Sequence, residues 1–345
     1  MEHRITQAGP LLDGLGRLKE PGYATSPVLA YERAAVGAPA WRITEWDSYL
    51  VNDDARAVAL TFSDLGYVGL VSASVLDFER RAYTTQSEIV IAPLGRMKLP
   101  ESSETGDIRW SNKRCSVEFA HVAGGRRLSF SMARFGDADL EAELLLDEEP
   151  RDSMVIATPW AEEATAFYYN RKIVGMRAQG AFRTGAELHE FAPETSLGLL
   201  DWGRGVWTYD NTWYWAVAQG YDADGRRIGL NLGYGFGDTS AASENMLFVD
   251  GVAHKLGRCD LGLTRSFGGE WRYMEPWHMS EQNGRVDLVF TPEIDRADLI
   301  DIAGAVRTEQ HQVFGTLKGR VVLDDGHELA IDGLRCAAER VHNRY

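Results

Sequence analysis

The sequence predicts an all-β protein built from antiparallel strands, and three observations carry this prediction. Turn signals recur at short intervals between apolar or alternating residues, which is the pattern of β-hairpins. Amphipathic helical periodicity never continues past about three turns. The chain has 345 residues, 44% of them hydrophobic and 25% charged, which suits two cores of about 150–200 residues each. Antiparallel meanders in sandwiches or barrels therefore fit better than a doubly wound fold.

Five hairpin turns follow one another along the chain. The segment HVAGGRRLSFSMAR, residues 121–134, places Gly124 and Gly125 between two runs of alternating character. Glycine supplies the positive φ angles that tight hairpin turns need. Mixtures of Asp, Asn and Gly between apolar runs mark the other four turns, at residues 222–225, 249–251, 282–284 and 324–326. Each turn predicts one pair of antiparallel strands.

Other segments are assigned from their composition. The sequence DADLEAELLLDEEPRD, residues 137–152, predicts a strand followed by a loop. The glycines of GYGFGD, residues 233–238, predict a strand that ends in a flexible loop, because the order of strand, GxGxxG and helix is missing. Short helices are predicted at Ala161–Ala166 and Ala241–Met246.

A domain boundary is predicted where polar and loop-forming residues interrupt two β-rich halves, at residues 184–196, TGAELHEFAPETS. We expect an N-terminal domain over residues 1–184 and a C-terminal domain over residues 185–345. The second of these carries the Trp-rich stretch described below, so we expect the binding cavity there.

The charge of the chain excludes some classes of partner. The formal net charge is −15 and the isoelectric point is about 5.0. Such a charge repels nucleic-acid phosphates and anionic membrane surfaces unless a local basic patch reverses the field. Arginine pairs at residues 80–81, 126–127 and 226–227 are isolated beside predicted turns. With no apolar run near the ~18 residues of a membrane span, we expect neither a nucleic-acid partner nor stable membrane insertion.

Cysteine and histidine usage predicts neither disulfides nor a metal site. Cys115, Cys259 and Cys336 are far apart and have no CxxC or Cys/His ligand spacing. The eight histidines are scattered, so we expect no metal and no cofactor. The opening MEHRITQAGPLLDGLGRLKEPG lacks the apolar core of a signal peptide, and we expect a cytoplasmic protein.

Residues 199–220, LLDWGRGVWTYDNTWYWAVAQG, form the most aromatic stretch of the chain. In a strand that begins near Asn211, a two-residue period places Trp213 and Trp215 on one face and Tyr214 on the other. Tryptophans of a β protein commonly belong to its core. The group as a whole exceeds what one strand needs for packing and suits the wall of an apolar or sugar-binding cavity. Its members are Trp202, Trp207, Tyr209, Trp213, Tyr214 and Trp215.

The segment DWGRG, residues 201–205, is predicted to leave the regular strand conformation. Two glycines bracket an arginine there and permit a tight turn or a close backbone approach. Such a turn would hold Asp201 beside Arg204 at the mouth of a barrel. The pair is then either a clamp that holds the loop or part of a site.

Several sequence blocks occur in a fixed order: GRL, WDSYLV and DLGYVGLVSASVLDFE, then DWGRGVW, WYWAVAQG, IGLNLGYGFGD, SENMLFVDGVAHKL, HQVFGTLKGRVVLDDG and AERVHNRY. This order resembles a largely bacterial family known as domain of unknown function 2804. The family is distantly similar to the lipocalin-like (calycin) proteins, which include carotenoid hydratases, tocopherol cyclases and two-barrel fungal cyclases. The resemblance implies two lipocalin-like antiparallel β-barrel domains and a cavity for a hydrophobic small molecule, and it leaves the reaction open.

Glu244 and Asn245 are candidate site residues outside the aromatic stretch. They precede the predicted strand MLFVDG, and His254 follows its turn. A carboxyl and an imidazole that meet across a hairpin can act as acid and base. Residues in such positions more often cap a short helix or face solvent.

Further candidates come from shorter patterns. The segment EPWHMS, residues 275–280, offers Trp277 and His278 before an Asn-Gly turn. Alternation directs Glu309 and His311 to the same side of a strand near the C-terminus. In the N-terminal half, a second cavity and ordinary packing are both open as roles for Trp46, Tyr49, Trp110 and Arg134.

The leading functional hypothesis is a cofactor-independent hydratase, cyclase or isomerase that acts on a terpenoid-like or lipid-like molecule. Asp201 is the first candidate for the acid, and Glu244 and Glu309 are the further catalytic candidates. Arg204 would either orient a substrate oxygen or hold Asp201 ionised. The substrate-binding candidates are Trp202, Arg204, Trp207, Tyr209, Trp213, Trp215, Asn245, Trp277, His278 and His311.

Two other hypotheses remain open. A non-catalytic carrier would use the same barrel to sequester a lipid or a pigment. A glycan-active enzyme would stack sugars on the tryptophans and use two carboxylates about 5–10 Å apart. Asp201 with Glu244 or Glu309 would supply that pair.

Overall fold

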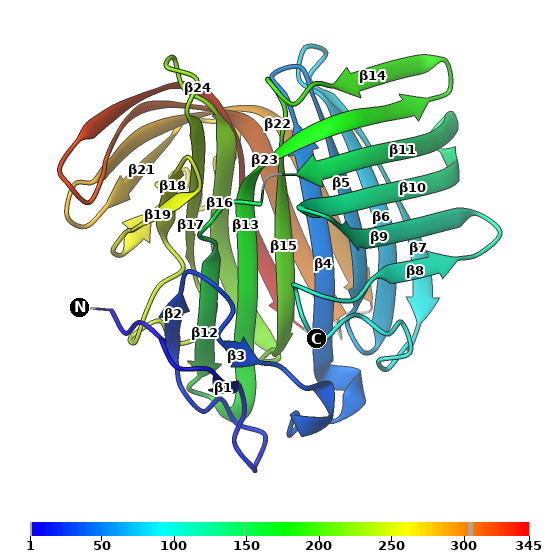
Figure 1. Ribbon diagram of the computed structural model, residues 1–345, viewed down its shortest axis with the longest axis vertical. Helices are drawn as coiled ribbons and strands as arrows, with labels where there is room; N and C mark the ends of the chain where they lie inside the picture. Colours follow the sequence, from blue (N-terminus) through cyan, green and yellow to red (C-terminus); the bar gives the residue numbers. More distant parts are fainter. Residues whose placement is uncertain (1, 148, 303–305, 345) are drawn as a thin grey trace.

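The computed structural model describes residues 2–147, 149–302 and 306–344. Within these residues the regular structure is almost entirely β, which confirms the predicted all-β class (Figure 1). Two large antiparallel sheets contain 13 and nine strands. A small parallel pair and two short 3-10 helices precede them, namely β1 (Gly9–Pro10), β3 (Leu29–Ala30), η1 (Arg33–Ala35) and η2 (Ala40–Arg42).

The first sheet has the order β7-β6-β5-β4-β15-β13-β11-β10-β9-β8, with β12 and β14 paired to β13, and β2 paired to β12. Its strands are β2 (Gly22–Ala24), β4 (Ile43–Asn52), β5 (Arg56–Asp64), β6 (Val68–Asp77), β7 (Ala82–Ile91), β8 (Ile108–Ser111), β9 (Cys115–Val122), β10 (Gly125–Phe135), β11 (Ala138–Asp147), β12 (Met154–Trp160), β13 (Glu163–Thr184), β14 (Glu187–Phe191) and β15 (Leu197–Val206).

The second sheet has the order β19-β18-β17-β16-β24-β23-β22-β21-β20. Its strands are β16 (Asp210–Tyr221), β17 (Arg227–Tyr234), β18 (Met246–Val249), β19 (Val252–Lys255), β20 (Cys259–Asp260), β21 (Trp277–Glu281), β22 (Val286–Ile302), β23 (Val306–Val322) and β24 (Glu328–Arg344). The chain passes from one sheet to the other between Val206 and Asp210. The division into domains at residues 184 and 185 stays a prediction.

All five predicted hairpins are confirmed, as the pairs β9–β10, β16–β17, β18–β19, β21–β22 and β23–β24. The strand predicted within residues 137–152 is confirmed as β11. Both short helices are wrong, because β13 begins at Glu163 and residues 241–245 have no helical structure. A six-residue helix has little stability of its own, and pairing with β12 and β15 decides the conformation of residues after Glu163.

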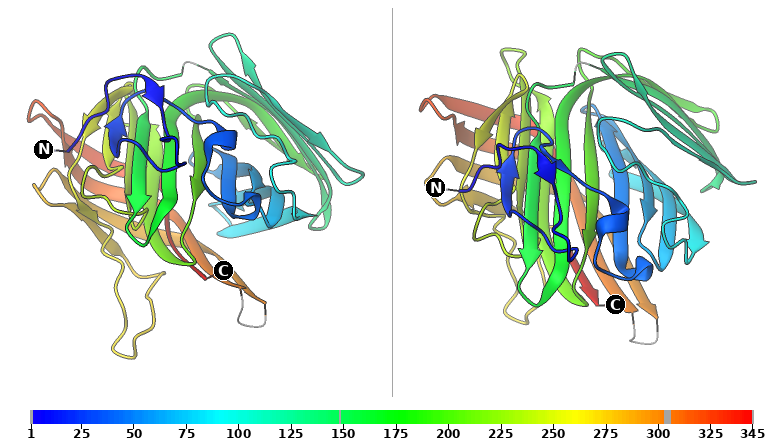
Figure 2. Two further views of the ribbon diagram at one scale, coloured as in Figure 1. Left: turned by 90° about the horizontal axis from the view of Figure 1, so that it is seen from below. Right: turned by 60° about the horizontal axis from the view of Figure 1, so that its bottom comes forward.

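Each sheet curls into a half-barrel, and the two sheets lie against each other (Figure 2). Alternation along β16 explains how the second sheet contributes to two cores. Trp215 and Val217 join the core shared with the first sheet, whereas Ala216 and Ala218 join a separate core on the opposite face. The face assignment predicted for this strand is therefore confirmed, and the shared core places β16 beside β13 and β15.

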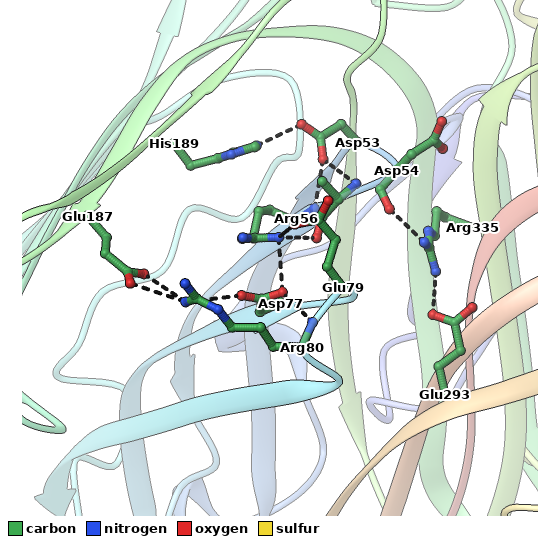
Figure 3. A network of polar contacts seen from close by, with 11 residues as sticks. Asp53, Asp54, Arg56, Asp77, Glu79, Arg80, Glu187, His189, Glu293 and Arg335 are labelled. Atoms are coloured by element: carbon green, nitrogen blue, oxygen red, sulfur yellow. Dashed lines mark hydrogen bonds and ion pairs between the residues drawn. The ribbon is translucent and has the colours of Figure 1, made fainter.

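A network of polar contacts ties the sheets together at one end (Figure 3). Arg335 of β24 pairs with Glu293 of β22 at 2.6 Å and donates to the carbonyl oxygen of Asp54 in the β4–β5 turn. The neighbouring Asp53 accepts from the ring of His189 on β14 at 2.7 Å. The same turn is thus fixed both to the second sheet and to the β13–β14 hairpin.

Candidate active site

The DWGRG segment lies inside β15 and not in a turn, so the predicted break in the strand is wrong. Strand alternation directs the residues at 201, 203 and 205 to one face and those at 202, 204 and 206 to the other. A Cβ atom on Gly203 would lie 2.0 Å from the indole ring of Trp46 on the neighbouring β4. The glycine is required because the tryptophan ring packs directly on the backbone. Of the two roles predicted for the glycines, a tight turn or a close backbone approach, Gly203 has the second.

Arg204 does not pair with Asp201, and that predicted contact is wrong. Its guanidinium lies on the opposite face of β15, where Nη2 is 2.9 Å from Oδ1 of Asp47. Further donated bonds reach the carbonyl oxygens of Trp46, Gly203 and Pro100. Because Arg204 is completely buried, this arrangement stabilises the sheet and gives the arginine no route to the cavity face.

Asp201 faces a lysine that is absent from the sequence-based candidates. Lys172 on β13 is directly opposite Asp201 in the β13–β15 register, and its Nζ atom is 3.8 Å from the Oδ1 atom of Asp201. Asn170 donates to the same Oδ1 atom at 2.7 Å. The carboxyl group therefore has both a cation and a neutral donor beside it.

Lys172 also anchors a buried network that includes Glu244. Its Nζ atom donates to the Tyr168 hydroxyl at 3.0 Å and lies 3.4 Å from Oε2 of Glu244. Asn231 donates to Oε1 of Glu244 at 3.3 Å. Burial, followed by the charges of Glu244 and Asp201, raises the pKa of Tyr168 well above its ordinary value. This phenol therefore stays protonated and donates to Glu244 at 3.2 Å.

A cavity of about 570 Å³ lies between the two sheets, a volume in the range of small-molecule sites. Strands β4, β5, β6, β7 and β15 form one wall, and β16, β22, β23 and β24 form the other. Leu199, Val217 and Ala337 are buried within it, whereas the lining residues Tyr83 and Asp298 are exposed. The cavity therefore reaches the surface beside Tyr83 and Asp298, and it belongs to both halves of the chain, although we expected it in the C-terminal half.

Glu339 is a further acidic side chain of the cavity, and it comes from the sheet opposite Asp201. It is 6% exposed and accepts hydrogen bonds from Trp213 Nε1 and Gln312 Nε2, both at 2.9 Å. Burial raises the pKa of the Glu339 carboxyl above its ordinary value. The donated hydrogen bonds and the charge of Arg296 oppose this effect, and burial outweighs them.

The aromatic candidates of residues 199–220 separate into different environments. Trp215 lines the cavity and donates to Asn231, and Trp213 holds Glu339. Trp207 packs against Trp213 with ring centroids 4.7 Å apart. Trp202 lies on the far face of β15, and the half-exposed Tyr209 lines a separate pocket beside Trp207.

Glu309 and His311 do share one face of β23, but it is the face opposite Gln310 and Gln312, which line the cavity. Glu309 pairs with Arg340 at 3.0 Å. His311 stacks on Tyr273 and contacts Asp295. The alternation that brings the two residues together also keeps them away from the cavity.

The remaining candidates, described next, do not line the cavity. Trp277 is buried in the second core, and His278 beside it is exposed. Asn245 accepts from the backbone of Gly233 and donates to that of Gly257, so it supports two loops. His254 contacts Asp324 and not Glu244.

Of the residues suggested for an N-terminal cavity, Trp46 lines the cavity between the sheets. Tyr49 also borders it, but its ring packs on Phe119 with the centroids 4.9 Å apart. Trp110 packs against Phe62, and Arg134 is exposed. The sequence-based candidates do not include Lys172, Asn170 and Tyr168. Their signal was available, because these residues occupy every second position of β13 and so share one face.

The described residues include no group of three or more His, Cys, Asp or Glu side chains that could hold a metal ion. Cys115, Cys259 and Cys336 are free thiols. No helix in the described part of the chain is long and apolar enough to cross a membrane.

Comparison with known proteins supports the fold. A protein of Nitrosomonas europaea described as AttH superposes with a TM-score of 0.54 at 13% identity, over 87% of this chain and 92% of that one. Kievitone hydratase from Nectria haematococca has a TM-score of 0.48 at 10% identity, over 97% and 98% of the two chains. No curated protein shows significant sequence similarity. The model of one family, described as domain of unknown function (DUF2804), matches residues 2–345, and the chain belongs to that family.

Proposed function

We propose that this protein is an acid–base enzyme of the hydratase or isomerase type that binds a small molecule in the cavity between the sheets. One observation carries the proposal: Glu339 and Asp201 line the same cavity from opposite sheets and have unlike surroundings. Pairs of acidic groups in contrasting environments are how enzymes divide the roles of acid and base. The chemistry requires no group other than these side chains and water.

Glu339 is the general acid in this scheme. Burial raises the pKa of its carboxyl, which favours the protonated form. Asp201 is the general base, because the ammonium of Lys172 and the amide of Asn170 both stabilise negative charge on it. The indole of Trp215, which also lines the cavity, can stabilise positive charge that develops on the substrate.

In a hydration, Glu339 transfers its proton to one carbon of a substrate double bond, and the π electrons form the new C–H bond. Water attacks the carbon left positive, and Asp201 accepts one proton of that water as the C–O bond forms. A proton then returns from Asp201 to Glu339 through solvent, so the net change is the addition of one water molecule. In an isomerisation, Asp201 instead removes a proton from a carbon next to the cation.

Isotope labelling tests the reaction class even while the substrate is unidentified. Purified protein is incubated with a bacterial metabolite extract in heavy water and, separately, in oxygen-18-labelled water. We expect at least one compound to gain carbon-bound deuterium, and a hydration product to gain oxygen-18 as well. An Asp201→Asn/Glu339→Gln double variant serves as the control, and labelling that is equal with this variant contradicts the proposal.

Glu339 also predicts a dependence of stability on pH. Its pKa is raised in the folded protein, so the folded state binds the proton more tightly than the unfolded state does. Stability from this group is complete below the ordinary glutamate pKa and is lost as the pH rises through the folded-state pKa. The glutamine of Glu339→Gln carries no charge, so this variant does not suffer the loss. Its free energy of unfolding should therefore increase relative to that of the wild type as the pH rises.

Urea unfolding of both proteins at several pH values between about pH 5 and about pH 9 measures this difference. The exposed Glu328→Gln on the same strand is the matched control. Its difference from wild type should remain nearly constant with pH. A constant difference for Glu339→Gln as well would contradict the raised pKa.

A further inference from the structure

We infer that the molecule bound between the sheets is a neutral, polyhydroxylated compound of the glycoside or polyol class. The inference rests on the proposed function, because that function places the site in this cavity. The observation that carries it is a band of hydroxyl groups across four adjacent strands of the cavity wall, of which Ser74 is buried and the others are half-buried. The band consists of Ser48, Thr61, Ser72, Ser74, Thr85 and Ser87.

Strand register makes the band continuous from β4 to β7. Ser48 is opposite Thr61, and Thr61 is opposite Ser72. Ser72 is in turn opposite Ser87, while Ser74 is opposite Thr85. All six side chains project from one face of the sheet toward β22, β23 and β24 of the other sheet. A continuous row of this kind offers hydrogen-bonding atoms along the length of a ligand and not at a single point.

The hydroxyl groups leave hydrogen-bonding capacity for a ligand. Ser48 and Thr61 form one hydrogen bond at 2.7 Å, which uses one of their two protons, and Ser74 with Thr85 does the same at 2.8 Å. A hydroxyl group has one donor and two acceptor lone pairs. Each of these pairs therefore retains one donor and free lone pairs for a hydroxyl of the ligand. Ser87 donates to Ser72 at 3.0 Å, and Ser72 donates to the carbonyl oxygen of Gln86 at 3.3 Å, so these two hydroxyl groups offer the ligand lone pairs only.

An apolar ligand would fit this wall poorly. Covering a hydroxyl group with hydrocarbon removes water without replacing its hydrogen bonds, which is unfavourable for each group that is covered. The aromatic faces of Trp46 and Trp215 lie in the same cavity. Rings with apolar faces and hydroxyl edges match such a combination of flat aromatic and hydroxyl surfaces.

The charges of the cavity favour a neutral ligand. Three acidic residues line it, Asp201, Asp298 and Glu339, against one arginine, Arg296. Arg296 already donates to Ser74, and burial lowers its pKa. With Glu339 protonated, as the proposed function requires, the carboxylates of Asp201 and Asp298 still outnumber this arginine. An anionic sugar acid or phosphate would therefore meet more negative than positive charge in the lining, whereas a neutral polyhydroxylated molecule meets no such repulsion.

Saturation-transfer NMR and titration calorimetry test this inference. The hydroxylated probes are methyl β-glucoside, cellobiose, maltose, lactose and p-nitrophenyl β-glucoside, and the apolar probes are retinol and palmitate. We expect saturable binding of at least one hydroxylated probe and no comparable binding of the apolar ones. Ser72→Ala/Thr85→Val should weaken that binding by about tenfold or more, because each hydrogen bond contributes about 0.5–1.5 kcal/mol.

The control is Ser129→Ala/Thr291→Val, which removes the same two kinds of hydroxyl outside the cavity and should leave affinity unchanged. Ser48→Ala is a second cavity variant if the double variant unfolds. Binding of the apolar probes alone, binding of no hydroxylated probe, or equal effects of the cavity and control variants would each overturn the inference. An apolar compound that is labelled in the isotope experiment overturns it and leaves the proposed reaction standing. Binding of a glycoside, with no isotope labelling that depends on Asp201 and Glu339, supports the inference and contradicts the proposed reaction.

Discussion

Replacing Glu339 with glutamine should lower kcat by a factor of about 10²–10⁴, the usual contribution of a general acid. Glutamine keeps the length of the side chain, and its one amide oxygen can still accept from Trp213 or from Gln312, which donate to different oxygens of Glu339. It cannot transfer the proton that starts the reaction. Ligand affinity should change little, because the lost interaction matters only in the transition state. Single-turnover kinetics on the compound found by isotope labelling separates these two quantities.

Asp201→Asn should also lower kcat, since an amide cannot accept the proton of the attacking water. Glu328→Gln supplies the comparison, because it makes the same chemical change on β24 at an exposed position. Full activity in Glu339→Gln would contradict the assignment of the acid. Full activity and unchanged binding in both cavity variants would instead support a carrier.

The fold could be predicted because its signals are local. A hairpin needs a few turn residues and two alternating runs, and all five such patterns fold as hairpins. The wrong prediction for the DWGRG segment has the same origin. Two glycines in five residues indicate a turn when the chain is considered alone, but Gly203 is small because Trp46 packs on it from another strand. Because Gly203 and Trp46 are far apart in the sequence, the segment itself does not show that a glycine is needed for this packing.

The site depends on contacts that no local pattern contains. Asp201 stands out by its aromatic neighbours, whereas the residue beside it is Lys172, from another strand of the same sheet. Glu339 acquires its raised pKa from burial between two sheets, and a single strand pattern does not determine which face that burial covers. Glu309 is the opposite case. Alternation correctly places it on the same face of the strand as His311, but that face points away from the cavity. Period fixes which residues share a face, and tertiary packing decides what the face meets.

Lys172 should contribute strongly to stability as a buried ion. Replacement with methionine keeps the unbranched shape of the side chain and removes the ammonium that lies 3.4 Å from Oε2 of Glu244. Glu244 is 3% exposed, so its carboxylate would be left in a medium that solvates charge poorly. Breaking a buried ion pair in this way costs about 3–5 kcal/mol. Urea unfolding at neutral pH should show this loss as a lower transition midpoint with an unchanged slope.

The double variant Lys172→Met/Glu244→Gln shows whether the loss arises from the unpaired charge. Glutamine at 244 can still accept a hydrogen bond from Tyr168 or from Asn231 through its one amide oxygen, and it leaves no buried carboxylate without a cation. The double variant should therefore be more stable than Lys172→Met alone, although it carries one more substitution. Additive losses would mean that Lys172 stabilises the protein through its ammonium over the ring of Trp215, 5.1 Å from the centroid, and not by pairing with Glu244. In either case Asp201 loses the ammonium beside it, so activity should fall in both variants even where stability recovers. The effects on stability and on activity differ because Lys172 contacts two carboxyl groups, the structural Glu244 and the proposed base Asp201.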